Sequence, residues 1–378
     1  MSFFQEIAKY GWDELAEVIS SREPVDVERA LTAEDLGIDG VASLLSPAAD
    51  QYLEQIAGRA QVLTEQRFGR VIGLYAPLYL SNSCSNSCAY CSFSADNKIE
   101  RITLSPAQME EDGRYLNEQG FRHILLVSGE DTKTVSMEYL QDVVGRLRPL
   151  FDSISIEIYP METEQYCTLA RCGVDGLIIY QETYNPSRYD EVHGGGQKKD
   201  FKWRLTTPER GGEAGFRRLG IGALLGLADW RVEALYLALH ARYLMKRYWR
   251  SQITISFPRL RPAVGGYTPP CPVSDRDLVH MMTVLRLFLP DAGLLLSTRE
   301  SPYLRDHMIP LGVTAMSAGS KTEPGGYTQE GKSAGQFEIS DHRSPGQIAE
   351  MIRSQGYEPV WKDWDMAFIP QVTARKTG

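Results

Sequence analysis

Three cysteines stand close together in the stretch C-S-N-S-C-A-Y-C-S-F, which runs from Cys84 to Phe93. Their C-x3-C-x2-C spacing directly follows an apolar run and is more specific than an isolated C-x-x-C pair. A cubane of four irons has four ligand positions, so three thiolates leave one iron open to another ligand. The stretch therefore predicts an iron–sulfur site held by Cys84, Cys88 and Cys91, with chemistry at the fourth iron.

Two simpler explanations of these cysteines fit less well. Zinc sites need a fourth ligand and favour paired C-x2-C knuckles, and no second knuckle follows. A structural disulfide is not expected, because the N-terminus has neither the basic nor the apolar region of a secretory signal. The other cysteines, Cys167, Cys172 and Cys271, are scattered, and we interpret the first two as small buried apolar residues.

The composition is that of an ordinary globular protein of 378 residues. It has 40 basic and 49 acidic residues and a net charge of −9, which argues against nucleic acid as the main partner. No apolar run approaches the roughly 20 residues of a membrane span. We therefore expect a cytoplasmic protein that binds neither a membrane nor nucleic acid.

The elements that must position the cysteines alternate between short apolar runs and amphipathic stretches from Val71 onward, as in βα units that build a parallel sheet. Strands are predicted at 71–80, 123–127, 153–158, 176–180, 221–225, 253–257, 294–297 and 313–317. Helices are predicted at 106–119, 136–147, 162–171, 208–218, 232–248, 275–289, 302–309 and 345–355. Eight such units indicate an α/β protein with a (β/α)8 TIM-type barrel.

This barrel is predicted to occupy residues 71–330. Residues 1–70 show apolar positions at helical spacing and read as a helical extension, with one long helix at 51–66. Residues 331–378 are expected to form a helix and a tail that pack on the barrel. Active sites of such barrels lie at the C-terminal ends of the strands, so polar residues directly after an apolar run become candidates.

Several strand ends carry such residues. Ser128, Gly129 and Glu130 belong to S-G-E-D, where glycine permits close backbone approach and the acid can meet an ammonium group, although the same segment also fits an ordinary turn. Glu157 ends an apolar strand and faces either inward or outward, since burying a carboxylate is costly without a partner. Further along the chain, candidates are Gln181 and Glu182 for hydroxyl groups, Arg204 for a carboxylate, and Ser317 in a Gly-rich loop.

Other polar residues near the predicted mouth are less specific. Arg259, Arg261 and Arg299 suit an anionic substrate group, but they suit ion pairs with barrel acids equally well. The triple glycine at 194–196 lacks the strand before it and the Lys-Ser or Lys-Thr after it that a phosphate loop requires, so we expect a flexible loop. The histidines show no metal-ligand spacing.

The cysteine spacing is also the signature of the radical S-adenosylmethionine (SAM) enzymes. Several long motifs between about Leu74 and Asp365 also resemble those of one family, the 2-iminoacetate synthases of thiamine biosynthesis, and they occur in the same order. These motifs are L-Y-A-P-L-Y-L-S-N-S-C-S-N-S-C-A-Y-C-S-F, Q-E-T-Y-N-P, F-K-W-R-L-T-T-P-E-R, G-A-L-L-G-L-A-D-W-R, S-F-P-R-L-R-P, L-S-T-R-E-S-P, S-K-T-E-P-G-G-Y and V-W-K-D-W-D.

The resemblance implies a barrel of the radical SAM kind and a lyase reaction. One 4Fe-4S cluster reduces S-adenosyl-L-methionine to methionine and a 5′-deoxyadenosyl radical, and that radical abstracts hydrogen from L-tyrosine. The Cα–Cβ bond then breaks to give p-cresol and 2-iminoacetate (dehydroglycine), which supplies the thiazole of thiamine. The resemblance also implies a flavodoxin or ferredoxin as electron donor and a complex with thiazole synthase.

Site roles follow from the same resemblance. The S-G-E-D segment matches the site for the amino group of SAM, Glu182 its ribose contact and Arg204 its carboxylate contact. Tyr79, Arg299 and Ser317 match positions that hold the backbone of the substrate amino acid. Glu157 is placed with the cofactor and Gln181 with the substrate, both on weaker motif evidence.

Three alternatives stay open at this stage. The tyrosine lyase of hydrogenase maturation shares the first half of the reaction, but it carries a second cluster bound by C-terminal cysteines, and no cysteine follows Cys271 here. A tryptophan lyase of peptide-antibiotic pathways lacks the R-L-T-T-P-E-R and V-W-K-D-W-D segments. A non-catalytic iron–sulfur protein would need neither an open iron nor a polar barrel mouth.

Overall fold

A closed barrel of eight parallel strands lies at the centre of the computed structural model, which describes residues 2–329, 334–363 and 365. The barrel closes because Gly73, Leu74 and Tyr75 of the first strand pair with the last strand. In order around the barrel the strands are β1 (Val71–Ser81), β3 (His123–Ser128), β4 (Ser153–Glu157), β5 (Gly176–Glu182), β7 (Arg218–Ala223), β8 (Gln252–Ser256), β9 (Gly293–Leu296) and β10 (Ala315–Ser317). The predicted (β/α)8 barrel is confirmed.

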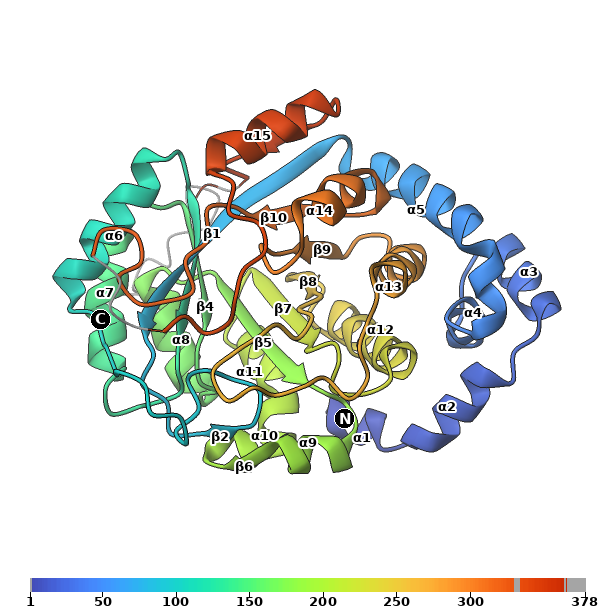
Figure 1. The fold of residues 1–378 in the computed structure, drawn as a ribbon, viewed down its shortest axis with the longest axis horizontal. Coiled ribbons are helices and arrows are strands. Elements are labelled where there is room, and N and C mark those ends of the chain that lie inside the picture. Colours follow the sequence, from blue (N-terminus) through green and yellow to red (C-terminus); the bar gives the residue numbers. More distant parts are fainter. Residues whose placement is uncertain (1, 330–333, 364, 366–378) are drawn as a thin grey trace, which may run out of the picture.

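Helices follow the strands and cover the outside of the barrel (Figure 1). They are α6 (Pro106–Glu118), α7 (Met137–Leu147), α8 (Thr163–Cys172), α11 (Thr207–Glu213), α12 (Trp230–Arg247), α13 (Asp275–Phe288), α14 (Pro302–Met308) and α15 (Pro345–Ser354). The N-cap predicted at Ser105 is confirmed, because its Oγ accepts a hydrogen bond from the Gln108 N–H at 3.3 Å. The helix predicted at 208–218 is shorter than expected, since Gly215 adopts φ +85° and β7 already begins at Arg218.

The N-terminal extension is helical, as predicted, and packs on α12 and α13 (Figure 1). It consists of α1 (Phe3–Ile7), α2 (Trp12–Ser20), α3 (Pro24–Thr32), α4 (Ile38–Leu44), the 3-10 helix η1 (Pro47–Tyr52) and α5 (Leu53–Phe68). The Phe3 ring stacks on His240 of α12 at 4.0 Å between centroids, and Arg231 of α12 pairs with Asp50 at 2.9 Å. The helix expected at 51–66 starts two residues later because η1 precedes it.

The segment after β10 returns across the mouth of the barrel. Its backbone N–H groups at Gln336, Glu338 and Ser340 donate to the carbonyls of Thr322, Pro262 and Thr298 at 2.9, 3.1 and 2.9 Å. A short strand that the sequence did not predict, β11 (Glu358–Val360), then pairs with the start of β1. The predicted domain boundary at 330 and most of the predicted tail, residues 366–378, lie outside the described residues.

One insertion departs from the βα pattern. Between β5 and α11 the chain forms α9 (Pro186–Val192), the strand β6 (His193–Gly195), the 3-10 helix η2 (Gln197–Lys199) and α10 (Phe201–Leu205). Strand β6 pairs antiparallel with β2 (Ser87–Cys88), inside the cysteine stretch. The expectation of a flexible loop at the triple glycine is therefore wrong, because Gly194 and Gly195 belong to a strand that pairs with the cysteine stretch.

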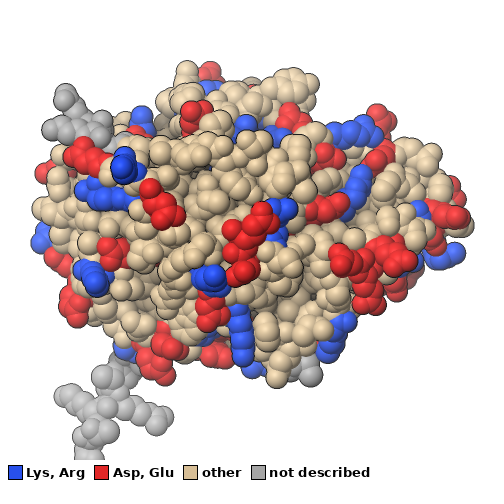
Figure 2. Space-filling model, turned by 60° about the horizontal axis from the view of Figure 1, so that its bottom comes forward, with Lys and Arg blue, Asp and Glu red and all other residues tan. Residues whose placement is uncertain are grey.

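The surface carries both signs of charge. Figure 2 shows acidic and basic side chains interspersed over one face, with no extended area of a single sign. No helix in the described part of the chain is long and apolar enough to cross a membrane. The expected lack of a nucleic-acid partner stays a prediction.

Candidate active site

The cysteine stretch leaves the C-terminal end of β1 and folds over the barrel mouth. Cys84, Cys88 and Cys91 all line one cavity, together with Ser128, Gly129 and Glu130 at the end of β3. Two contacts fix the stretch to β3: the Glu130 N–H donates to Cys84 Sγ at 3.4 Å, and the Ser85 N–H donates to the Glu130 carbonyl at 3.0 Å. A Cβ on Gly129 would lie 2.2 Å from the Ser83 carbonyl oxygen, so only glycine permits this approach.

The three thiols share one cavity. Within the described residues, no group of three or more His, Cys, Asp or Glu side chains could hold one metal ion. Burial raises the pKa of Cys84, Cys88 and Cys91, while the nearby Lys198 ammonium lowers it. A multi-iron cluster with three thiolate ligands would bring positive charge to these sulfur atoms.

A chain of alternating charges lines the far side of this cysteine cavity. Arg204 of α10 donates to Glu130 at 2.7 Å and to Glu182 at 3.3 Å, and its Nε donates to the Tyr180 carbonyl at 2.6 Å. Lys198 Nζ donates to Glu182 at 2.6 Å. Because of these two cations the pKa of Glu182 is lowered although burial alone would raise it. Glu182, at the end of β5, also adopts φ +71°, a strained backbone conformation that changes the direction of its side chain.

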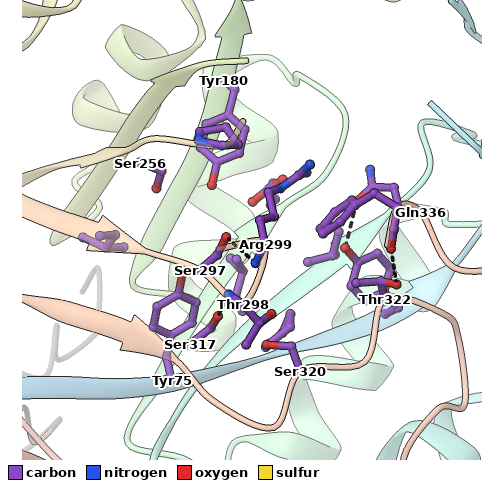
Figure 3. Close-up of a pocket in the computed structure, with 18 of the residues that line it drawn as sticks. Tyr75, Tyr180, Ser256, Ser297, Thr298, Arg299, Ser317, Ser320, Thr322 and Gln336 are labelled. Carbon is purple, nitrogen blue, oxygen red and sulfur yellow. Dashed lines mark hydrogen bonds between the residues drawn. The ribbon is translucent and has the colours of Figure 1, made fainter. Parts of the chain in front are cut away.

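A second cavity adjoins the first one at the barrel mouth (Figure 3). Its lining includes Tyr75 and Tyr79 of β1, Arg299 after β9 and Ser317 at the end of β10. Phe337 lies against Arg299, with the guanidinium carbon 3.3 Å from the ring centroid. Arg299 Nη1 donates to the Arg259 carbonyl at 3.4 Å, and among the described residues Arg299 forms no ion pair.

The two cavities share a wall formed by Val127, Glu157 and Gln336, which line both. Gln336 comes from the segment that crosses the mouth, and its Oε1 accepts a hydrogen bond from the Tyr79 hydroxyl at 2.8 Å (Figure 3). Burial, followed by the Glu182 charge, raises the pKa of Glu157 to about 7. The two cavities therefore lie next to each other, separated only by these three side chains.

Most predicted site residues meet at these two cavities. The cysteine cavity brings together the three thiols and the predicted cofactor residues, namely Ser128, Gly129, Glu130, Glu157, Glu182 and Arg204. The second cavity brings together Tyr79, Arg299 and Ser317. Gln181 lines neither cavity, and its Nε2 donates instead to the Phe201 carbonyl at 3.4 Å. Strand alternation explains this difference, because neighbours on β5 point to opposite faces of the sheet.

The three candidate arginines differ in their interaction partners. Arg259 and Arg261 both pair with the buried carboxylate of Glu300, the second of them at 3.0 Å, so they serve as structural ion pairs. Arg299 alone of the three points into the second cavity without a carboxylate partner. Position at a strand end did not distinguish these cases, because S-F-P-R-L-R-P and S-T-R-E-S-P look alike; only the family resemblance had singled out Arg299.

Sequence reasoning missed several residues of the site. Lys198 follows the triple glycine and reaches the cysteine cavity only because β6 pairs with β2. Gln336 and Phe337 lie far along the chain and arrive through the returning segment. Asn86, within the cysteine stretch, donates from Nδ2 to Glu130 at 2.8 Å and accepts from the Lys198 N–H at 3.0 Å. The proximity of the triple glycine to the F-K-W-R motif was the one available signal for Lys198.

Comparisons with known proteins agree with this geometry. Residues 78–239 match the model of the Radical SAM superfamily, and residues 256–358 match the Biotin and Thiamin Synthesis associated domain. The 2-iminoacetate synthase of Escherichia coli (strain K12) is 46% identical over 355 residues, which is 94% of each chain. The chain belongs to the 2-iminoacetate synthase family. The enzyme of the same name from Salmonella typhimurium is also 46% identical over 94% of each chain.

Solved structures place this member of the 2-iminoacetate synthase family among similar barrels. HydG, a maturase of the [FeFe]-hydrogenase, matches with a TM-score of 0.84 and 31% identity over 95% of this chain and 78% of that one. HydG from Carboxydothermus hydrogenoformans matches with a TM-score of 0.81 and 34% identity, over 94% of this chain and 81% of that one. Methylornithine synthase matches with a TM-score of 0.71 at 19% identity, which supports the fold alone.

Proposed function

We propose that this protein is a radical SAM lyase that cleaves the Cα–Cβ bond of L-tyrosine to 2-iminoacetate and p-cresol. Methionine and 5′-deoxyadenosine form from S-adenosyl-L-methionine in the same turnover. Every atom of tyrosine ends in 2-iminoacetate or p-cresol, and the conversion of SAM to methionine and 5′-deoxyadenosine consumes two electrons and one proton. The 2-iminoacetate supplies the thiazole of thiamine.

The observation that carries the proposal is the pair of adjoining cavities. One is lined by the three thiols, and the other contains Arg299, a half-buried guanidinium without an ion pair in the described part of the chain. An unpaired guanidinium fits the carboxylate of an amino acid in a two-point contact. The wall between the cavities would put the cofactor and the amino acid within reach of each other.

In this proposal the cluster, when bound, supplies the electron that cleaves SAM. Cys84, Cys88 and Cys91 hold it from one side of the cavity. The S-G-E-D segment receives the amino group of SAM, Glu182 the ribose hydroxyls and Arg204 the carboxylate. Since Arg204 already contacts Glu130 and Glu182, its guanidinium is held in place before the cofactor arrives.

On the substrate side Arg299 binds the carboxylate of tyrosine, and Tyr79 and Ser317 orient the rest of its backbone. Gln336 and Phe337 line this cavity and would limit the access of water to the reacting atoms. Gln181 has no role here, because its side chain lies outside the lining of both cavities.

Partners follow from the chemistry. We propose that a small redox protein such as a flavodoxin or ferredoxin supplies the electrons, and that the protein is located in the cytoplasm. An imine of this kind hydrolyses readily in water, so direct transfer to thiazole synthase in a complex would protect it. These partners are expected from the family.

The test is anaerobic incubation of reconstituted protein with SAM, dithionite and L-tyrosine. We expect equimolar p-cresol and 2-iminoacetate, the second measured as glyoxylate after hydrolysis, together with 5′-deoxyadenosine. If 5′-deoxyadenosine forms without p-cresol, the lyase substrate is not tyrosine. If neither forms, the radical SAM lyase proposal is wrong. A protein that holds the cluster but never cleaves SAM would correspond to the non-catalytic alternative.

A further inference from the structure

Glu157 occupies an unusual place for a carboxylate. It ends β4 at the barrel mouth and lines both the cysteine cavity and the second cavity. Neither of its carboxylate oxygens forms a hydrogen bond or an ion pair with another described residue, whereas Glu130 and Glu182 beside it are both paired with cations. Glu157 is half-buried, and holding a carboxylate in a cavity without a cationic partner is costly, so a ligand group is expected to complete this site.

The surroundings of Glu157 are crowded with ionisable groups. Across the cysteine cavity lie Glu182 of β5, Arg204 of α10 and Lys198 after the triple glycine. Glu182 raises the pKa of Glu157, and the two cations lower it. On the other side lie Arg299 after β9 and three phenols, Tyr75 and Tyr79 of β1 and Tyr180 of β5, whose charges interact with Glu157. Lys198 and Arg204 are already engaged by Glu182, so neither needs Glu157 as its partner.

The ligand group that suits this position is an ammonium group. Arg299 shares the second cavity with Glu157 and carries the opposite charge. An amino acid has a carboxylate and an ammonium group on the same carbon, and the pair of Arg299 and Glu157 matches both. We propose that Glu157 binds the ammonium group of the substrate amino acid at the wall between the two cavities and accepts a proton from it. This inference rests on the proposed function.

The step is a proton transfer alone. One N–H bond of the ammonium group breaks, one O–H bond forms on Glu157, and no electron is exchanged. The substrate then has a neutral amine, the form from which an imine can be produced when the Cα–Cβ bond breaks. The raised pKa of Glu157, about 7, makes its carboxylate a stronger base than an exposed glutamate.

The position also has a consequence for geometry. An amine held at Glu157 lies beside the wall that faces the cofactor, and the phenol ring is directed into the second cavity, toward Tyr75 and Ser256 (Figure 3). Glu157 therefore acts as a catalytic residue for the substrate and not as a ligand of SAM. This assignment differs from the role that the sequence motif implied.

A pair of ligands that differ only in the amine tests the inference. L-Tyrosine and 3-(4-hydroxyphenyl)propanoate share the phenol and the carboxylate, and only tyrosine has the ammonium group. The experiment measures equilibrium binding of each to anaerobically reconstituted protein, for the wild type and for Glu157→Gln. The substitution should weaken tyrosine binding about tenfold or more, since it removes a charge-assisted contact, and leave the propanoate within about twofold.

The pH dependence adds a second readout. In the wild type the affinity for tyrosine should rise with pH through about 7, because the carboxylate becomes charged in that range. Glu157→Gln should show no such rise, and Glu157→Asp should restore part of it. Iron content and the affinity for S-adenosylhomocysteine should stay at the wild-type level in both variants, which shows that they fold.

Three results would overturn the inference. Glu157→Gln could bind tyrosine as the wild type does, it could lose both phenolic ligands equally, or it could lose S-adenosylhomocysteine instead, as a cofactor ligand would. A wild-type protein that neither binds nor cleaves L-tyrosine refutes the proposed function itself. A wild type that cleaves tyrosine, beside a Glu157→Gln protein with unchanged tyrosine affinity, refutes the role of Glu157 alone.

Discussion

Gly196, the last residue of the triple glycine, should be indispensable for the cysteine cavity. It adopts φ +84° and ψ −179°, a conformation that essentially only glycine tolerates. A Cβ at this position would lie 2.1 Å from Asn86 Oδ1, 2.7 Å from Asn86 Cα and 2.8 Å from the Ser85 carbonyl oxygen. Two of these three atoms are backbone, so Gly196→Ala must push β6 away from the cysteine stretch.

The magnitude follows from two contributions. The backbone conformation itself costs an alanine about 1–3 kcal/mol. The displacement also breaks the hydrogen bond from the Lys198 N–H to Asn86, for roughly 1 kcal/mol more. We therefore expect Gly196→Ala to destabilise the closed arrangement of β2 and β6 by about 3 kcal/mol, which corresponds to roughly a hundredfold change in the opening equilibrium.

Limited proteolysis with trypsin measures this opening directly, because Lys198 and Lys199 follow the glycine and are cleaved when the segment opens. Cleavage after these lysines should be roughly a hundredfold faster in Gly196→Ala, and the iron bound per chain after reconstitution should fall. Gly194→Ala is the matched control, since its Cβ would meet Ser87 only at 3.6 Å. If Gly196→Ala matched Gly194→Ala in both cleavage rate and iron content, the argument would be wrong.

Other substitutions test the remaining parts of the site and the core. Cys88→Ala should abolish the cluster, so an unchanged iron content and EPR signal would contradict the ligand assignment. Arg299→Ala should raise the KM for tyrosine by about tenfold or more without changing iron content or slow, substrate-free SAM cleavage, because one charge-assisted contact to the substrate is lost. Gln336→Ala, which opens the wall between the cavities, should increase the ratio of 5′-deoxyadenosine to p-cresol; a ratio equal to the wild type would show that Gln336 only fills space. Burial raises the pKa of Glu233 to about 8, so the wild type should lose stability between about pH 4.5 and 8, as the unfolded chain releases the proton first. Glu233→Gln should not show this loss in thermal unfolding followed by circular dichroism.

The sequence was a good guide to the frame of the barrel. Each predicted strand and helix from Val71 onward is present, because apolar runs and amphipathic stretches alternate there with clear caps such as Ser105. It was a poor guide to the insertion between β5 and α11. Glycines without side chains give no hydrophobic pattern, so nothing local predicts that β6 pairs with Ser87 and Cys88.

The sequence by itself determined that the three cysteines lie together. The spacing of Cys84, Cys88 and Cys91 is a local property, since three ligands within eight residues must end on the same loop. Residues directly after apolar runs were also predictable, because parallel strands of a barrel end at one rim. Glu130 and Glu182 were predicted in this way, whereas Arg204 was predicted from its motif.

Only the tertiary structure decided which of these groups form ion pairs and which of them line the cavities. It paired Arg259 with Glu300 and left Arg299 without a carboxylate, and it brought Lys198 and Gln336 to the cavities from distant parts of the chain. It also showed that Glu157 faces inward, between the two cavities and without a protein partner. Charge pairing and the orientation of a side chain depend on contacts across the fold, and those contacts leave no pattern in the neighbouring residues.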